Sequence, residues 1–174
     1  GPDGTVQVGP QSAGAVPGPA CYGRGGLEPT ISDANLLLGR LTSDRPLAGG
    51  LFLDIEKAKE SFHLIASAMG ADDFVAAADG VLSIAITKMA GAVREVSVHR
   101  GFDPRDFSLI SFGGAGPMHG FFVAEELGIS QVIIPLLPGH LSALGQMMAN
   151  LRRDLVKAWG GALSTLSVTS LMEE

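Results

Sequence analysis

The sequence predicts an α/β fold, in which helices predominate and cover a short, partly parallel sheet. Two apolar runs, at 107–112 and 130–136, alternate with helical patterns over 116–128 and 140–159. Strands that alternate with helices in this way pair in parallel, and an unbroken apolar run is typical of a strand buried on both faces. Hydrophobic residues make up 46% of the chain but aromatic residues only 6%. We therefore expect a core of Ala, Leu, Val and Ile that lets helices pack closely.

The first third of the chain predicts a strand, a long loop and a short helix. Residues Thr5–Val8 alternate between polar and apolar side chains, as in a short strand. Glycine or proline then recurs every two or three positions over 9–29, which excludes a regular element. A short helix is expected over 32–41, with Ser32 or Asp33 as its N-cap.

Two longer helices follow. Asp54 is the expected cap of a helix that continues to about residue 69 and ends at Gly70. Asp72 or Asp73 is the expected cap of the next helix, whose apolar positions recur at helical spacing as far as Val96. The apolar face of this second helix consists of Phe74, Ala78, Val81, Leu82, Ala85, Met89, Ala92 and Val96.

Composition excludes several classes of function. The net charge of −6 and the absence of a basic stripe exclude a nucleic-acid partner. The single cysteine, Cys21, excludes an internal disulfide framework and is typical of a reducing cytoplasm. Residues 127–151 carry no charged side chain, but Pro135, Pro138 and Gly139 interrupt them, which predicts two buried elements joined by a turn and no membrane span.

The sequence is expected to be a piece of a larger protein, because it opens within a strand pattern and closes without a stop signal. Three parts are expected. Residues 1–30 form the first strand and the Gly/Pro-rich loop, residues 31–157 form the helical and α/β segment, and residues 158–174 begin a following segment or tail.

The most informative motif is the glycine turn, Gly113 to Pro117, which follows the first apolar run. Ligands of open parallel sheets bind at the carboxyl ends of strands, where such turns lead into helices. Glycine permits positive φ and removes the Cβ that would hold a ring or phosphate away. The turn does not match the dinucleotide fingerprint, because His119 stands where its third glycine belongs, and it lacks the lysine of a P-loop. Two interpretations stay open: a ligand contact, or a tight turn without a ligand.

Several single residues also have two interpretations. Cys21 is a nucleophile or a buried structural thiol, and its sequence neighbours include no base. Asp33 and Asn35 bind metal or substrate, or serve as helix caps. His119 contacts phosphate or substrate, or is satisfied by the local backbone. His140 lies in the turn after the second apolar run, where it could reach the same crevice as His119.

Two stretches carry a resemblance to a known family. "VGPQSAGAVPGPACYGRGGLEPTISDANLLLGRL" and "VSVHRGFDPRDFSLISFGGAGPMHGFFVAEELGISQVIIPLLPGHLSALG" resemble the hydantoinase A and 5-oxoprolinase family, in the family's order and over roughly positions 6 to 157. The resemblance implies an actin-like (ribonuclease H-like) ATPase lobe that binds ATP and Mg²⁺. It also implies an enzyme that couples ATP hydrolysis to the opening of a cyclic amide, with phosphorylation of the amide oxygen preparing the carbonyl for water. ATP-dependent ketone carboxylases resemble the same family.

The resemblance also implies roles for particular residues. Gly113, Gly114, Ala115, Gly116 and His119 would contact the adenosine side of the nucleotide. The loop around Asp33 and Asn35 would face substrate or metal, with Ser32 in place of the family's usual threonine.

The implied partners are a small cyclic amide, the remaining lobe of the same polypeptide and a hydantoinase B-type subunit or domain. The superfamily's first phosphate motif, of the Asp-x-Gly-Gly-Thr type, is absent from these residues. We therefore expect no turnover by this segment alone, because phosphoryl transfer depends on positioning and metal neutralisation. A non-catalytic interaction lobe is the alternative from another class.

Overall fold

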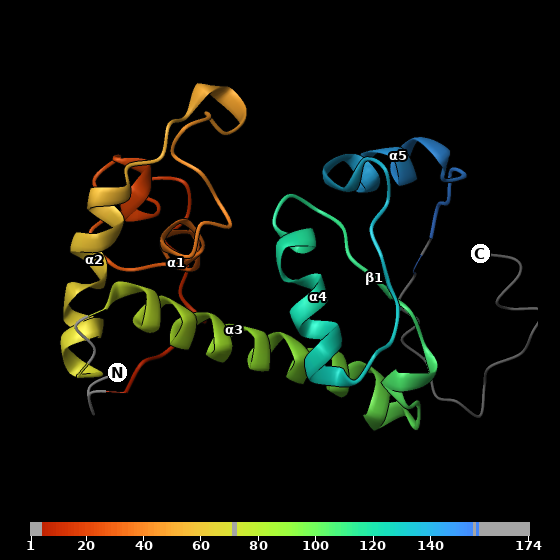
Figure 1. Ribbon diagram of the computed structural model, residues 1–174. Coiled ribbons are helices and arrows are strands. Elements are labelled where there is room, and N and C mark those ends of the chain that lie inside the picture. Colours follow the sequence, from red (N-terminus) through yellow and green to blue (C-terminus); the bar gives the residue numbers. More distant parts are fainter. Residues whose placement is uncertain (1–4, 71–72, 155, 157–174) are drawn as a thin grey trace, which may run out of the picture. The chain divides into compact units, whose positions relative to one another are not determined.

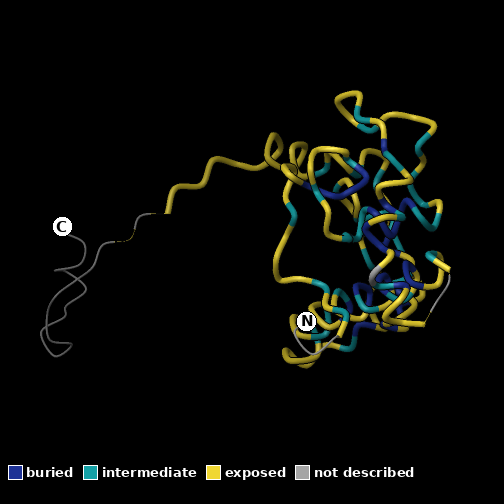
Figure 2. Tube along the Cα trace, turned by 90° about the vertical axis from the view of Figure 1, so that its left-hand side faces the viewer, coloured by how far each residue is buried: buried dark blue, intermediate teal, exposed yellow. Residues whose placement is uncertain are grey.

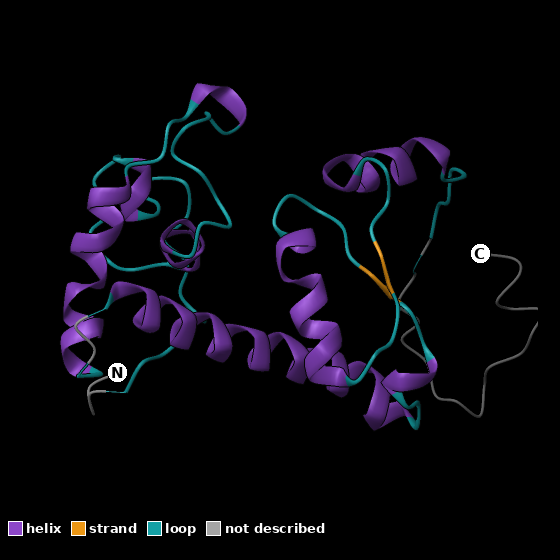
Figure 3. Cartoon of the chain, in the orientation of Figure 1, coloured by secondary structure: helices purple, strands orange, loops and turns teal. Residues whose placement is uncertain are grey.

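The computed structural model describes residues 5–70, 73–154 and 156 (Figure 1). Helices dominate, and one pair of very short strands forms a sheet (Figure 3). In order along the chain, the helices and strands are α1 (Ile31–Leu37), α2 (Ile55–Ala68), α3 (Phe74–Ser97), β1 (Leu109–Ile110), α4 (Gly116–Leu127), β2 (Val132–Ile133) and α5 (Leu141–Met148).

A capping box starts helix α1. Thr30 is its N-cap and accepts a hydrogen bond from the Asp33 amide, while the Asp33 carboxylate accepts one from the Thr30 amide. The prediction that Ser32 or Asp33 caps this helix was therefore wrong by two or three residues. Asp33 belongs to the cap, but as the side chain that reaches back from the first turn.

The starts of α2 and α3 follow the sequence signals. Asp54 accepts from the amides of Glu56 and Lys57, and Asp73 accepts from the amide of Val75, which confirms both acidic caps. The predicted apolar face of α3 is correct only in its first half, because Ala92 and Val96 are exposed. The buried stripe instead continues through Ile86 and Ala90.

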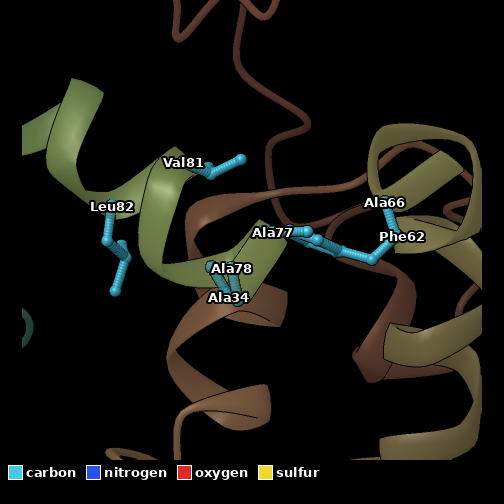
Figure 4. Close-up of a cluster of buried hydrophobic side chains, with 7 residues drawn as sticks. All are labelled: Ala34, Phe62, Ala66, Ala77, Ala78, Val81 and Leu82. Atoms are coloured by element: carbon cyan, nitrogen blue, oxygen red, sulfur yellow. The ribbon is translucent and has the colours of Figure 1, made fainter. Parts of the chain in front are cut away.

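Small side chains build the first core, as the composition predicts. Phe62 of α2 is fully buried and lies against alanines contributed by α1, α2 and α3 (Figure 4). The small alanine side chains let three helices approach this aromatic ring closely, in keeping with the dense packing of protein interiors. The buried members of this cluster are Ala34, Phe62, Ala66, Ala77, Ala78, Val81 and Leu82.

The sheet has one covered and one open face. β1 and β2 are parallel, with Leu109 opposite Val132 and Ile110 opposite Ile133, which confirms the predicted parallel pairing. Leu109 and Val132 pack on a second core cluster, formed by α3, α4 and the second residue after α4. Its buried members are Ile86, Ala90, Val123, Ala124, Leu127 and Ile129. Ile110 and Ile133 are 55% and 43% exposed, so the prediction of strands buried on both faces was wrong.

Residues 5–8 do not form the predicted strand. They are assigned to no strand or helix, and neither named strand of the described chain pairs with them. Val6 and Val8 pack against the first core cluster, and the Lys88 ammonium donates a hydrogen bond to the Val8 carbonyl. The alternating pattern thus reflects one side of an extended segment laid on helices.

The chain divides into two compact units, residues 1–141 and 142–174. In the second unit α5 ends at Met148, and residues 149–154 are neither helix nor strand, so the predicted helix over 140–159 is too long. Its predicted end lies outside the described residues. Residues 142–154 are exposed, which contradicts the prediction of a buried element here (Figure 2).

One helical segment, Phe74–Arg100, is long and apolar enough to cross a membrane by length and composition alone. The same property is typical of a core helix, and the first half of α3 is in the core shown in Figure 4. The predicted turn between two elements in 127–151 is present as a short 3₁₀ helix, Pro138–His140, between β2 and α5.

Candidate functional site

The glycine turn joins β1 to α4, as the sequence predicts. Gly113 has φ of +87°, a conformation that side-chain-bearing residues rarely adopt, and its amide donates a hydrogen bond to the Pro138 carbonyl at 2.8 Å. Gly114 is exposed, and a Cβ built on it would meet no atom within 4 Å. The backbone at these two positions is therefore held in place but left bare.

The next two glycines lie near Ser111. A Cβ on Gly116 would lie 3.4 Å from the Ser111 Oγ, and one on Gly120 would lie 2.5 Å from the same atom. Ser111 is buried directly after β1, so Gly120 lets α4 approach the strand closely, whereas a Cβ on Gly116 would make an ordinary contact. Packing therefore accounts for Gly120, and no protein atom accounts for the bare surface at Gly114.

The N-terminus of α4 points to the same turn. Ala115 is the N-cap and provides no side-chain acceptor, and Pro117 lies in the first helical turn. The first amides of a helix lack partners within the helix and carry partial positive charge. This end of α4 therefore favours a negatively charged group.

His119 lies in α4 directly after this turn and is only 7% exposed. Its Nδ1 is buried and has no hydrogen-bond partner in the described residues. Burial, and then the nearby positive charge of Arg40, lower the pKa of the imidazole, so it is neutral at pH 7. A histidine satisfied by the local backbone would have a hydrogen-bond partner for Nδ1, so that interpretation does not account for this atom.

Arg40 approaches α4 from the end of α1, and sequence analysis did not single it out. Its amide donates to the Asn35 carbonyl at 2.9 Å, and its guanidinium carbon lies 4.1 Å from the centroid of the Phe122 ring, a cation–π contact. Its Nη1 is buried and makes no hydrogen bond, and no carboxylate of the described chain forms an ion pair with it. The available sequence signal was a lone arginine between Gly39 and Leu41 after a leucine run.

Asp33 fixes the end of the Gly/Pro-rich loop, which precedes α1. Its fully buried carboxylate accepts hydrogen bonds from the amides of Cys21, Ala20 and Thr30 and from the Thr30 hydroxyl, at 2.7, 3.3, 2.9 and 2.7 Å. Both carboxylate oxygens are thus engaged by the protein. These contacts favour the capping interpretation, and a metal or substrate contact of Asp33 stays a prediction.

Asn35 is also buried, and its Nδ2 donates to the Ile31 carbonyl at 2.8 Å. Its Oδ1 has no partner in the described residues. The Asn35 side chain is therefore bonded to the backbone of its own helix, α1. The backbone carbonyl of Asn35 accepts hydrogen bonds from the amides of Arg40 and Leu41, just after the end of that helix.

Cys21 is fully buried between the loop and α1. Burial raises the pKa of its thiol above the ordinary range, and the hydrogen bond and charge of Asp33 raise it further. A nucleophilic cysteine requires a lowered pKa. The environment of Cys21 therefore favours the structural interpretation.

Metal ligands do not gather in the described residues, where no group of three or more His, Cys, Asp or Glu side chains could hold an ion. His63, His99 and His140 are exposed. His140 belongs to the turn whose Pro138 carbonyl accepts a hydrogen bond from the Gly113 amide, so the two turns are in contact through their backbones.

Fold and turn together define a class of protein. A parallel strand–helix–strand unit with a bare glycine turn at the carboxyl end of its first strand is the arrangement in which α/β proteins bind ligands. Comparison with known proteins gives the family, because the hydantoinase/oxoprolinase family matches residues 2–155. The chain belongs to the hydantoinase/oxoprolinase family, which confirms the resemblance found in its motifs.

Three relatives are informative. The chain is 45% identical to caprolactamase subunit alpha of Pseudomonas jessenii over 87% of this chain and 22% of that protein. The crystal structure of that ATP-dependent caprolactamase superimposes with a TM-score of 0.76 over 83% of this chain and 21% of that chain. A 5-oxoprolinase of Saccharomyces cerevisiae is 37% identical over 85% of this chain and 12% of its own length.

A nucleotide-free structure of acetone carboxylase, from work on ATP-dependent acetone carboxylation, superimposes with a TM-score of 0.72 at 32% identity, over 81% of this chain and 20% of that chain. The relatives thus include both hydrolases and a carboxylase. The chain spans about a fifth of the length of the caprolactamase subunit that it matches.

Proposed function

We propose that the chain forms part of the ATP-binding core of an enzyme that couples ATP hydrolysis to the opening of a cyclic amide. In this proposal Gly113 and Gly114 lie under the adenosine side of the nucleotide, with Ala115, Gly116 and His119 beside it. The bare, fixed backbone at Gly114 carries the proposal, because no protein atom lies within 4 Å of a Cβ built there.

The family supports the hydrolase activity. Caprolactamase and 5-oxoprolinase, as their names state, act on cyclic amides, and the caprolactamase is ATP-dependent. ATP would then transfer its terminal phosphate to the amide oxygen, and water would attack the activated carbonyl. The residues in hand supply a place for the nucleotide rather than the group that activates water.

An actin-like lobe is the fold that we infer for the complete protein, with this chain as its helix-rich part. Mg²⁺ would then bind with ATP, but the described residues do not fit a metal site of their own, because the Asp33 oxygens are already occupied by hydrogen bonds. The further partners would be the remaining lobe of the same polypeptide and a hydantoinase B-type subunit or domain, since the caprolactamase relative is named as a subunit. We infer a cytoplasmic location.

A ketone carboxylase is the second candidate, and the match to acetone carboxylase favours it. The same nucleotide turn would serve both reactions, because the caprolactamase and the acetone carboxylation are both described as ATP-dependent. A non-catalytic interaction lobe is the third candidate.

The deciding experiment replaces Gly114 by valine in the full-length protein. We expect ATP affinity and ATP-dependent turnover to fall together, because the valine side chain would occupy the space that the nucleotide needs. Folding should hold, since Gly114 has no positive φ and no close neighbour. The matched control is Gly91→Val in α3, an exposed glycine that also has open space around it.

Equilibrium binding of ATP, measured by calorimetry, and release of ADP are the two readouts. Unchanged values for Gly114→Val in a folded protein would exclude the turn as the nucleotide site and leave the interaction lobe as the interpretation. Amide hydrolysis and carbonyl carboxylation, assayed with the same wild-type protein, separate the first candidate from the second.

A further inference from the structure

Buried polar atoms without partners are rare in folded proteins, and each requires a cause. Among the side chains of the described residues there are three such atoms: Asn35 Oδ1, Arg40 Nη1 and His119 Nδ1. Arg40 and His119 come from α1's end and from α4, yet the charge of Arg40 acts on the imidazole of His119. Arg40 also lies over Phe122, three residues after His119 in α4. Two of the three atoms therefore belong to residues that lie in or against α4, the helix that follows the glycine turn.

The Arg40 guanidinium is a positive charge without a counter-ion. Arg94, Arg105 and Arg152, by contrast, each form an ion pair with a carboxylate. Arg40 is half-buried and held by the Phe122 ring, and no carboxylate of the described chain pairs with it. A desolvated cation is costly unless an anion compensates it. An anionic ligand would provide that compensation, and partial exposure leaves a small anion room to approach.

His119 contributes a neutral imidazole, and the start of α4 contributes backbone amides. A neutral imidazole carries one N–H, which can donate to an oxyanion without adding a second charge beside Arg40. Helix N-termini preceded by glycine turns bind phosphate through their free amides. The planar guanidinium suits phosphate better than a single oxygen, because it offers paired N–H donors.

We propose that Arg40, His119 and the N-terminus of α4 form a binding site for a phosphate group, supplied by the nucleotide. This inference rests on the proposed function in one respect, the assignment of the phosphate to ATP. The phosphate chemistry itself depends on Arg40, His119 and the α4 amides alone. In the bound state the Arg40 guanidinium, which has no carboxylate partner in the described chain, gains a counter-ion.

The test is carried out on the full-length protein, with titration calorimetry of ATP, adenosine and pyrophosphate. Arg40→Gln should weaken ATP and pyrophosphate about tenfold to a hundredfold, the usual effect of losing a hydrogen bond to a charged group. Adenosine affinity should change less than twofold. Arg40→Lys keeps the charge but loses the planar fork, so its affinities should fall between those of the wild type and Arg40→Gln.

The matched control is Arg45→Gln, which removes the same charge from an exposed arginine five residues away and should leave all three affinities unchanged. Circular dichroism and the thermal midpoint check that each variant is folded. If Arg40→Gln does not fold, Arg40→Lys provides the test instead. Unchanged ATP and pyrophosphate affinities in folded Arg40 variants would overturn the proposal. An equal loss of adenosine binding would also overturn it, because it would indicate a general distortion.

The two proposals fail in different ways. If Gly114→Val leaves ATP binding unchanged but Arg40→Gln still weakens pyrophosphate, the phosphate site stands and the nucleotide assignment of the turn falls. If Gly114→Val abolishes ATP and adenosine binding while Arg40→Gln changes no affinity, the turn stands and the phosphate site falls.

Discussion

Replacing Asp33 by asparagine should loosen the Gly/Pro-rich loop that precedes α1 without changing its shape. In the wild type, one oxygen of Asp33 accepts from the Cys21 amide, and the other accepts from Ala20 and twice from Thr30. Every neighbour is a donor. Asparagine keeps one acceptor oxygen, but its NH₂ group must then point at a backbone N–H that has no other acceptor.

The least costly placement puts the amide oxygen toward Ala20 and Thr30 and the NH₂ group toward Cys21. This arrangement loses the 2.7 Å hydrogen bond to the Cys21 amide and leaves that buried donor unsatisfied. A hydrogen bond to a charged group contributes about 1.5–3 kcal/mol, and leaving a buried donor unpaired adds to the loss, so we expect local destabilisation of about 2–4 kcal/mol.

Hydrogen exchange followed by mass spectrometry measures this locally in the full-length protein. Amides of residues 18–23 should exchange about 30- to 1000-fold faster in Asp33→Asn, the factor that corresponds to 2–4 kcal/mol. Alkylation of Cys21, whose thiol is fully buried, should accelerate in parallel because both need the same opening.

Asp73→Asn is the matched control. It makes the same chemical change at the exposed cap of α3, where asparagine caps equally well, and it should leave the exchange of residues 18–23 unaltered. If Asp33→Asn preserved exchange protection and slow alkylation, the Asp33 hydrogen bonds would not be what holds this loop.

Two further predictions follow from the glycines and from His119. Gly120→Ala should destabilise the protein by about 1–3 kcal/mol, because the new Cβ would lie 2.7 Å from the Ser111 Cβ. Gly114→Ala should leave stability unchanged, because a Cβ there meets no atom within 4 Å. Urea unfolding measures both variants, and equal midpoints would contradict this prediction. Because burial lowers the pKa of His119, the unfolded chain takes up a proton more readily than the folded chain. The folded protein is therefore fully stable with respect to this group above the ordinary histidine pKa, and it loses stability as pH falls below that value. His119→Gln should remove part of this loss, so its urea midpoint should drop less between pH 7.5 and pH 5 than that of the wild type. An equal drop in the two proteins would refute the assignment.

Local signals were sufficient for the elements whose ends are set by their own residues. Helices α2 and α3 begin at their acidic caps, Asp54 and Asp73, and α4 ends at Gly128, whose backbone is left-handed. The start of α1 was placed too late, because Thr30 and Asp33 act as a reciprocal pair and the prediction read only single caps. A Thr-x-x-Asp pattern was present and would have given the correct start.

Elements that depend on distant partners could not be predicted in the same way. Val6 and Val8 alternate like a strand, but a strand requires a neighbouring strand, and these side chains pack on helices instead. Arg40 was missed for a related reason, since its contact with Phe122 joins positions that are far apart in sequence. The glycine turn itself was found, but only the structure shows that Gly114 has open space around it and that Gly120 must be small because Ser111 lies against it.

The short sheet explains why this segment should need the rest of its protein. The strand that leads to the glycine turn pairs over only two residues on one edge, and its Ile110 side chain is 55% exposed. Burying an aliphatic side chain of this size contributes about 1.5–3 kcal/mol, so covering the exposed face would stabilise the sheet. The chain spans about a fifth of its caprolactamase relative, and the rest of that length is a ready source of cover. Covering this face would fix β1, and with it the turn that β1 carries, so nucleotide affinity should be far lower in the isolated segment than in the complete protein.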